Sequence, residues 1–191
     1  MSIVDSVAQG KRRGSENSRS AVFPVSDNLG YVSNMNSFFA ALNNNLDLEA
    51  AEILPNLLLS SQYVALDINV LLKYRITHIL NAASYVENRF SHNFIYKRVN
   101  VIDLPSEDIK SYFEECCRFI HEARRSGGRV LVHCNAGVSR SVSFVCAYLV
   151  KYEKFSVINA LAYIREKRPV ARPNAGFIKQ LMDYEVEIRN V

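Results

Sequence analysis

The sequence predicts an α/β domain of three layers, with helices on both sides of a central, mostly parallel sheet. Two observations support this fold class. Short apolar runs occur at residues 53–59, 77–80, 94–102 and 130–132, and helical patterns separate or follow them. The run Val130-Leu131-Val132 is apolar throughout, which is typical of a strand buried on both faces of a parallel sheet. Strands early in the chain and helices late then favour a layered domain.

The first half of the domain contains the strands and one amphipathic helix. Residues 53–59 and 77–80 are predicted strands, with a helical stretch at 67–74 between them, and residues 94–102 alternate as a half-buried strand does. Ser106 is the predicted cap of the next helix, with Glu107 and Asp108 in its first turn. One face of that helix carries Ile109, Phe113, Cys116, Cys117, Ile120 and Ala123.

The second half is mainly helical. Glycines at 127 and 128 end the amphipathic helix, and the strand at 130–132 follows. Residues 141–150 are apolar almost all round, which predicts a buried helix. Asn174 is the predicted cap of the last helix. Apolar positions mark the last two helices: Val157, Ala160, Leu161 and Ile164 in one, Phe177, Leu181, Tyr184 and Ile188 in the other.

The length of 191 residues, with 49% hydrophobic residues, suits one domain with a proper core. The regular pattern occupies residues 47–191. Residues 1–46 are polar, with a basic cluster at 11–13 and no sustained periodicity, so we expect a flexible N-terminal extension. A short helix around residues 36–48 is the one element expected near its end.

The composition argues against several classes of partner. A net charge of +4 without a concentrated Lys/Arg stripe does not favour nucleic-acid binding. No apolar run reaches the length of a membrane span, and no secretory segment opens the chain, so we expect a cytoplasmic protein with the nucleus as a second compartment. The four cysteines and four histidines lack metal-ligand spacing, and no metal or cofactor is expected. The oligomeric state is left open.

The segment 133–141 carries the strongest functional signal. A tight loop between a buried strand and a buried helix turns successive backbone N–H groups inward, where they bind a tetrahedral oxyanion. Cys134 opens the loop, and the same N–H groups and helix dipole stabilise its thiolate. Arg140 closes the loop and can grip two phosphate oxygens at once. Ser141 can donate its hydroxyl to the sulfur, and His133 is expected to orient the loop.

The residues between Cys134 and Arg140 are the predicted phosphate-binding backbone. Gly137 relaxes the turn where a side chain would obstruct it. The other three cysteines are interpreted as small buried apolar residues, because none stands in such a context. The phosphate-binding set is Asn135, Ala136, Gly137, Val138, Ser139 and Arg140.

With this loop the chain resembles the protein tyrosine phosphatase superfamily, and most of all its small, atypical dual-specificity phosphatases. The similarity continues at Asp103-Leu104-Pro105 and at Pro173-Asn174-Ala175-Gly176-Phe177, and covers roughly residues 48–190. The resemblance implies a cysteine-phosphatase fold over residues 47–191. It also implies hydrolysis of phosphotyrosine and phosphoserine or phosphothreonine in proteins, through a phosphocysteine on Cys134.

The resemblance makes Asp103 the general acid, because it lies 31 residues before Cys134 (134 − 103) at the end of a predicted strand. Asp108 and Glu107 are the alternative carboxylates, although both suit the start of a helix. Arg168 and Arg172 precede the Pro173–Asn174 cap and either flank the substrate or lie on the surface.

The resemblance is greatest to the member linked to stress-activated kinase pathways. It implies phosphoprotein substrates and, as partners, kinases of stress-activated or mitogen-activated pathways. The uncharged loop interior argues against phosphoinositide substrates. Glucan-directed members of the superfamily need an attached carbohydrate-binding module, for which we expect no room in this chain, so glucan substrates are also disfavoured. Two alternatives stay open: a catalytically weak phosphoprotein-binding protein, which the intact Cys134 and Arg140 disfavour, and an additional role as a scaffold.

Overall fold

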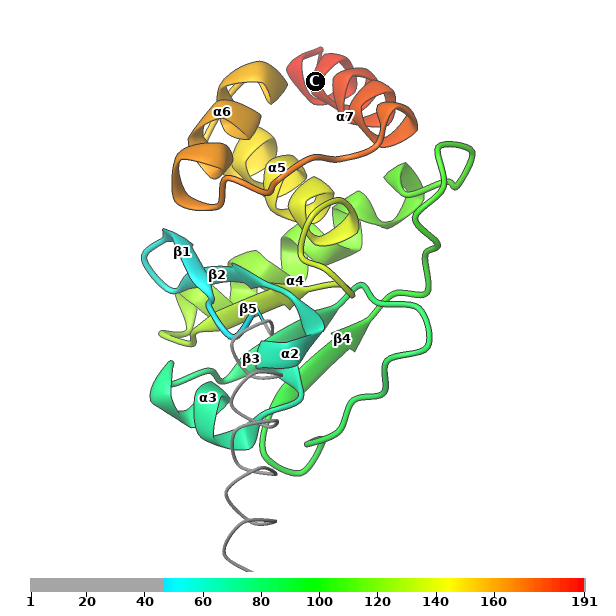
Figure 1. Ribbon diagram of the computed structural model, residues 1–191. Coiled ribbons are helices and arrows are strands. Elements are labelled where there is room, and N and C mark those ends of the chain that lie inside the picture. The colour runs from blue at the N-terminus through cyan, green and yellow to red at the C-terminus, as the bar shows by residue number, and fades with distance from the viewer. Residues whose placement is uncertain (1–46, 191) are drawn as a thin grey trace, which may run out of the picture. The chain divides into compact units, whose positions relative to one another are not determined.

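The computed structural model describes residues 47–190 (Figure 1). The extension predicted over residues 1–46, and all but the last two residues of the helix predicted at 36–48, lie outside this range. At the centre is a five-stranded sheet with the order β1-β2-β5-β3-β4. Only β1 and β2 are antiparallel, which confirms the prediction of a mostly parallel sheet. The strands are β1 (Ala51–Leu54), β2 (Leu57–Ser60), β3 (His78–Asn81), β4 (Ile95–Arg98) and β5 (Val130–His133).

The prediction of one strand over residues 53–59 was wrong. Pro55 and Asn56 form a tight turn, so these residues belong to a hairpin of β1 and β2 in which Leu54 pairs with Leu57. Asn56 takes a φ of 66°, a left-handed conformation that asparagine tolerates better than most residues. Apolar residues on both sides of the turn made the run look continuous.

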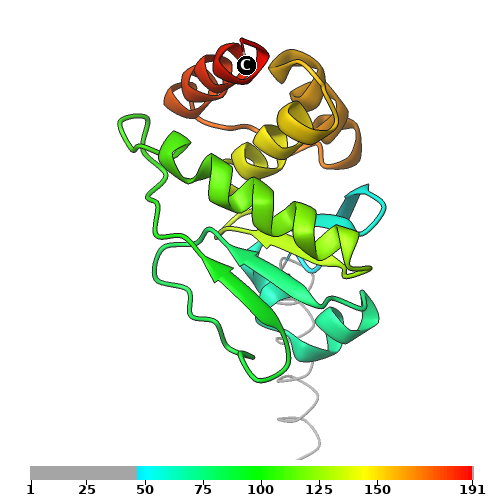
Figure 2. The same cartoon turned by 180° about the vertical axis from the view of Figure 1, so that it is seen from behind.

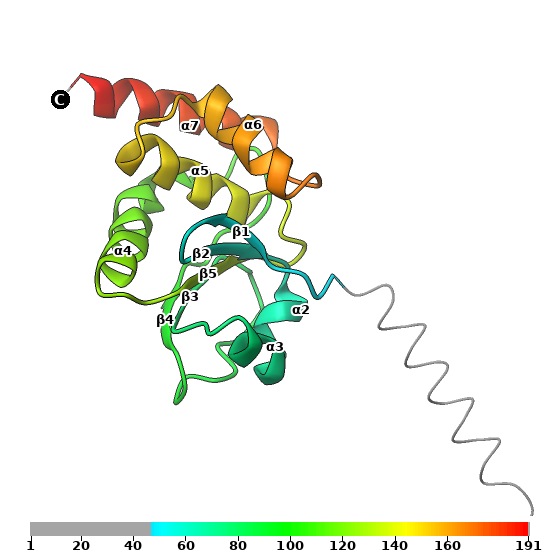
Figure 3. The ribbon, with the colours of Figure 1, turned by 90° about the vertical axis from the view of Figure 1, so that its left-hand side faces the viewer.

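Alternate residues of the inner strands pack against different helices. Leu58, Ile79 and Leu131 face α2 (Gln62–Ala65) and α3 (Ile68–Lys73) on one side of the sheet. Leu57, Leu59, Leu80, Val130 and Val132 belong to the larger core on the other side. That side is covered by α4 (Phe113–Arg125) and α5 (Arg140–Tyr152), with α6 (Val157–Lys167) and α7 (Ala175–Arg189) packed further out. Figure 3 shows the two helical layers with the sheet between them, as predicted.

The start of α4 differs from the prediction. Ser106 is not its cap: a 3₁₀ turn, η1 (Lys110–Tyr112), precedes the helix, which begins at Phe113. The N–H groups of Ile109 and Lys110 each donate to Oε1 of Gln180 on α7, 2.9 Å away. A residue about 70 positions later therefore takes the place of a local cap. Figure 2 shows α4 lying across the sheet beside this turn.

The buried helix predicted at 141–150 is α5, and every residue from Arg140 to Val150 is buried. Among the helices of residues 47–190, none is both long and apolar enough to span a bilayer. The parallel strands β2, β3 and β5 end at one edge of the sheet, where Ser60 and Asn81 both pair with His133. The loop 134–139 leaves this edge and enters α5, and the segments after β3 and β4 start from the same edge (Figure 1).

Candidate active site

The loop 134–139 turns tightly between β5 and α5 because Gly137 adopts a left-handed φ of 66°. A Cβ at this position would lie 2.5 Å from the backbone carbonyl of Ser60 and 2.6 Å from Nη2 of Arg168. Only glycine therefore fits here without moving the loop. The glycine that the sequence singled out thus has both a conformational and a steric reason.

Cys134 is buried at the bottom of this loop, and the residue is 1% exposed. Two donors point at its sulfur: the Gly137 N–H and the Ser141 hydroxyl, each 3.2 Å from Sγ. Both stabilise a negative charge on sulfur, and the start of α5 adds the positive end of a helix dipole. The predicted contact between Ser141 and the nucleophile candidate is present.

Arg140 is held on three sides. Its Nη1 donates to the Ser84 hydroxyl and to the Val101 carbonyl, both at 3.2 Å, and its Nη2 donates to Oδ1 of Asn135 at 2.7 Å. Its Nε is buried and has no hydrogen-bond partner among residues 47–190. A fixed, buried guanidinium with one N–H left over is suited to receive an oxyanion above the loop.

Asp103 lies over the loop, with 35% of its side chain exposed. Its Oδ1 accepts hydrogen bonds from the Ser139 hydroxyl at 2.7 Å and from Nδ2 of Asn174 at 2.9 Å. Its Oδ2 is 3.7 Å from Nε of Arg140. The structure thus brings Asp103, Arg140 and the loop together, as the sequence predicted.

The alternative carboxylates lie elsewhere. The carboxylate of Asp108 accepts a hydrogen bond from the Ser111 N–H at 3.2 Å, at the start of η1. The backbone carbonyl of Glu107 accepts a hydrogen bond from Nε2 of Gln180. The Asp108 carboxylate therefore serves the start of the helical turn, in agreement with the interpretation of the sequence, whereas the contact of Glu107 is made by its backbone and not by its carboxylate. Asp103 is the carboxylate that contacts the loop residue Ser139.

His133 is almost fully buried, and its Nδ1 lies 3.4 Å from the Cys134 carbonyl oxygen. Burial lowers the pKa of His133 to about 4; the hydrogen bond to Cys134 opposes this shift and the charge of Arg140 adds to it. The ring is therefore neutral near pH 7. A neutral, hydrogen-bonded imidazole fits the expected role in orienting the loop.

Arg168 does not reach the mouth of the site as a free side chain. It is 6% exposed, and its Nε and Nη2 donate to the carbonyls of Gly137 at 2.7 Å and Ala136 at 3.1 Å. Its Nη2 also forms an ion pair with Asp47. Arg172 is exposed, and its backbone N–H donates to the Val138 carbonyl at 2.7 Å.

Three site residues escaped the sequence analysis. Ser84 holds Arg140, Asp47 pairs with Arg168, and the amide of Asn174 reaches Asp103 while its Oδ1 caps α7 at the Phe177 N–H. The sequence predicted Asn174 as a helix cap. Its hydrogen bond to Asp103 could not be predicted, because that bond depends on where the segment after β4 folds. The other two are common residue types without a local pattern.

The three remaining cysteines are in the core, as expected. Cys116, Cys117 and Cys146 are fully buried. Burial raises the pKa of Cys117 to about 12 and also raises the pKa of Cys116 and Cys146. These thiols stay protonated and are unsuited to act as nucleophiles.

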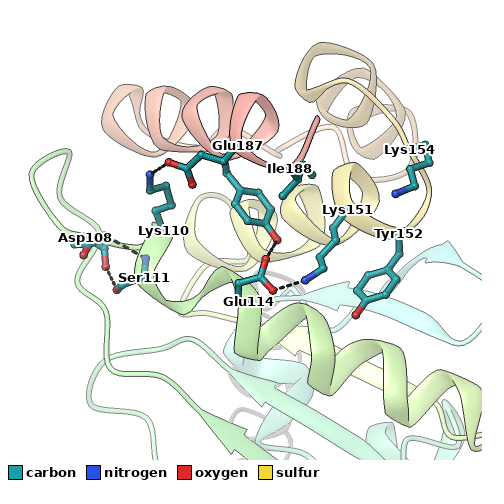
Figure 4. Close-up of a pocket in the computed structure, with 10 residues that line it drawn as sticks. Asp108, Lys110, Ser111, Glu114, Lys151, Tyr152, Lys154, Glu187 and Ile188 are labelled. Atoms are coloured by element: carbon teal, nitrogen blue, oxygen red, sulfur yellow. Dashed lines mark hydrogen bonds and ion pairs between the residues drawn. The ribbon is translucent and has the colours of Figure 1, made fainter. Parts of the chain in front are cut away.

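A cavity of about 730 Å³ lies away from the loop, between the ends of α4, α5 and α7 (Figure 4). Its charged walls are largely paired with each other: Lys110 with Glu187 at 2.5 Å, and Glu114 with Lys151. Tyr184 donates a further hydrogen bond to Glu114. The chemically equipped site is therefore the small loop at the sheet edge and not this larger cavity.

An inward-facing loop around a buried thiol, with an arginine at its end and a carboxylate above it, defines the class of cysteine-dependent phosphatases. Residues 57–187 match the family model described as the dual specificity phosphatase, catalytic domain. The chain belongs to this family.

Known relatives agree with this assignment. The chain is 47% identical over 141 residues to dual specificity protein phosphatase 19 of Mus musculus, covering 74% of this chain and 64% of that protein. It is 49% identical over 129 residues to dual specificity protein phosphatase 1 of Arabidopsis thaliana, covering 68% and 65%. The chain thus matches slightly less than two thirds of the length of these relatives.

The fold has a similar solved counterpart. The human tyrosine phosphatase-like serine/threonine/tyrosine-interacting protein superimposes with a TM-score of 0.70 at 37% identity. The match covers 72% of this chain and 96% of that one. The prediction of a small cysteine-phosphatase domain is confirmed.

Proposed function

We propose that this chain is a protein phosphatase that hydrolyses phosphotyrosine and phosphoserine or phosphothreonine through a phosphocysteine on Cys134. One observation carries the proposal: two donors lie 3.2 Å from the Cys134 sulfur, the Gly137 N–H in the loop and the Ser141 hydroxyl in the first turn of α5, directly after Arg140. Such a loop can bind the phosphate and keep the thiol as a nucleophile at once. Family membership and an intact set of candidate residues support the activity.

In the first step the phosphate oxygens accept hydrogen bonds from the loop N–H groups and from the guanidinium of Arg140. The thiolate of Cys134 attacks phosphorus, so that an S–P bond forms while the P–O bond to the leaving group breaks. The leaving oxygen takes a proton from the carboxyl of Asp103. Oδ1 of Asp103 accepts two hydrogen bonds, whereas Oδ2 accepts none from residues 47–190 and lies 3.7 Å from Nε of Arg140, so Oδ2 is the oxygen that carries this proton.

In the second step the ionised Asp103 accepts a proton from water, and the water oxygen attacks the phosphorus of the phosphocysteine. The S–P bond breaks and inorganic phosphate leaves. The hydroxyl of Ser141 donates to the departing sulfur, which stabilises the thiolate as the bond lengthens. The enzyme returns with Cys134 ionised and Asp103 protonated.

For Arg168 we propose a role behind the loop in place of a contact with substrate. Its hydrogen bonds to the carbonyls of Ala136 and Gly137 support this role, because a carbonyl held outward turns the N–H of the same peptide plane inward. Arg172 is the exposed member of the pair and stays a candidate for contact with acidic or phosphorylated groups of a substrate.

The proposed substrates are phosphoproteins of stress-activated or mitogen-activated kinase pathways, and the kinases themselves are the candidate partners. The proposed compartment is the cytoplasm, with the nucleus as the second. All four cysteines are free, and the mechanism needs a reduced thiol, which these compartments maintain. Isolating phosphoproteins from cells with the Asp103→Ala variant tests the substrate class, since a trapped set without pathway components argues against it.

The activity is tested by comparing wild type with Cys134→Ser on a phosphotyrosine peptide, a phosphothreonine peptide and a small aryl phosphate. We expect turnover by wild type and none by Cys134→Ser. Cys116→Ser is the matched control, because it makes the same atomic change at a buried thiol in α4 and should retain turnover. Equal, negligible turnover by wild type and Cys134→Ser would favour the alternative, a phosphoprotein-binding protein.

A further inference from the structure

Tyr85 combines two unusual features. Its φ is 65°, the left-handed region that aromatic residues rarely adopt, and its side chain is 91% exposed. A strained conformation persists where the surrounding structure imposes it, and such positions gather at ligand sites. An exposed aromatic ring also gains nothing from the core of its own domain.

The residues on both sides of Tyr85 are fixed by buried polar groups. Ser84 donates from its hydroxyl to the Val101 carbonyl at 2.5 Å and accepts from Nη1 of Arg140 at 3.2 Å. On the other side, the carbonyl of Val86 accepts from Nδ2 of the fully buried Asn81 at 2.8 Å. These contacts hold the Tyr85 backbone in place beside the guanidinium of the phosphate loop.

Two more exposed apolar side chains lie on the segment that follows Val101, which Ser84 joins to the Tyr85 segment. Ile102 and Leu104 are 47% and 51% exposed, and they flank the acid candidate Asp103. The hydrogen bond between Ser84 and Val101 joins the two segments, so Tyr85 and Ile102 each follow directly after a bonded residue. Single exposed apolar residues are ordinary, but three on two hydrogen-bonded segments next to the loop point to a shared binding surface.

We propose that Tyr85, Ile102 and Leu104 form an apolar rim that binds apolar side chains adjacent to the phosphorylated residue of a protein substrate. The inference rests on the proposed function, because the loop must take the phosphate for the rim to meet its neighbours. A small aryl phosphate ends within the loop, whereas a peptide continues across the segments that carry the rim. The rim therefore selects among phosphopeptides and leaves the chemistry of the loop unchanged.

The test uses two phosphotyrosine peptides, one with leucines on both sides of the phosphotyrosine and one with serines there. Their affinities for the full chain carrying Cys134→Ser are measured by fluorescence anisotropy, so the readout does not depend on turnover. We expect the leucine peptide to bind about tenfold more tightly. Adding Tyr85→Asn should abolish most of that preference, since asparagine tolerates the left-handed backbone but has no ring. Tyr85→Phe should keep it.

Leu72→Asn is the matched control. Leu72 is an exposed apolar residue near the end of α3, 59% exposed, and should not affect either peptide. Equal affinities of the two peptides, or a preference that survives Tyr85→Asn, would overturn the proposal that this rim binds apolar side chains. Turnover of a small aryl phosphate by the protein with an intact Cys134 is measured in parallel. Absence of this turnover would refute the proposed activity, while the preference between the two peptides would still test whether the rim binds apolar side chains.

Discussion

Replacing Gly137 by alanine is expected to lower kcat/KM about 100-fold. The new Cβ would lie 2.5 Å from the Ser60 carbonyl carbon and oxygen, about 0.9 Å closer than the 3.4 Å of ordinary contact. Ser60 cannot yield easily, because it is buried in β2 and paired with His133. The loop must therefore shift by nearly 1 Å, and a misplacement of that size at a reacting centre costs about 100-fold.

The shift acts on a specific contact. The Gly137 N–H lies 3.2 Å from the Cys134 sulfur, and moving it outward weakens both thiolate stabilisation and phosphate binding. The left-handed φ of 66° adds a strain of about 1–2 kcal/mol for alanine, which lowers stability separately from activity. Steady-state kinetics on a small aryl phosphate measures the first effect, and thermal unfolding measures the second.

Gly127→Ala separates the two effects. Gly127 also has a left-handed φ, 79°, but a Cβ there meets nothing within 4 Å, and it lies in the turn after α4. This variant should lose only the stability that the left-handed backbone costs, about 1–2 kcal/mol, and keep wild-type kinetics. If Gly137→Ala retained kcat/KM within a few-fold of wild type, the claim that the loop N–H positions control catalysis would be refuted.

Three further substitutions test individual side chains of the site. Asp103→Asn should slow hydrolysis of an alkyl phosphate about 100-fold or more and affect an aryl phosphate with a good leaving group much less; equal losses on both would remove Asp103 as the acid. Arg168→Met should lower kcat on a small aryl phosphate, because the carbonyls of Ala136 and Gly137 lose their donor, with partial recovery in Arg168→Lys; an unchanged kcat with a raised KM for peptides would instead indicate contact with substrate. His133 has a pKa lowered to about 4 against an ordinary value of 6.5, so its neutral form contributes stability that is complete above pH 6.5 and declines as the pH falls toward 4. At pH 5.5 this loss is about 1 kcal/mol, and the pH dependence of unfolding between 6.5 and 5 should flatten in His133→Asn. A slope identical to wild type would contradict the buried neutral histidine.

The loop and its nucleophile could be predicted because everything they need is contiguous. Cys134, Gly137 and Arg140 lie within seven residues, between a strand and a helix that each have a clear apolar pattern. Asp103 was predictable only through its flanking residues and the family resemblance. Nothing local says that a carboxylate 31 residues before the cysteine will meet Ser139.

The contacts that position Cys134, Arg140 and Asp103 could not be predicted from neighbouring residues in the sequence. The sequence left two roles equally open for Arg168, contact with the substrate or a position on the surface. The side chain is in fact buried against loop carbonyls 31 and 32 positions away in sequence. Ser84 reaches Arg140 across 56 positions. The misplaced cap at Ser106 has the same cause, because Gln180 satisfies the start of the helix from a distant element. Partners at such separations depend on the assembled fold.

The central claim is that Cys134 carries the phosphoryl group during turnover. The most direct measurement is rapid acid quenching of the Asp103→Ala variant with an aryl phosphate whose good leaving group does not need the acid, followed by mass spectrometry of the digested protein. Without its base, hydrolysis of the intermediate is slowed, and we predict one phosphoryl group on the peptide that contains Cys134. Turnover with that peptide unmodified at every quench time, or with the phosphoryl group on another residue, would contradict the account.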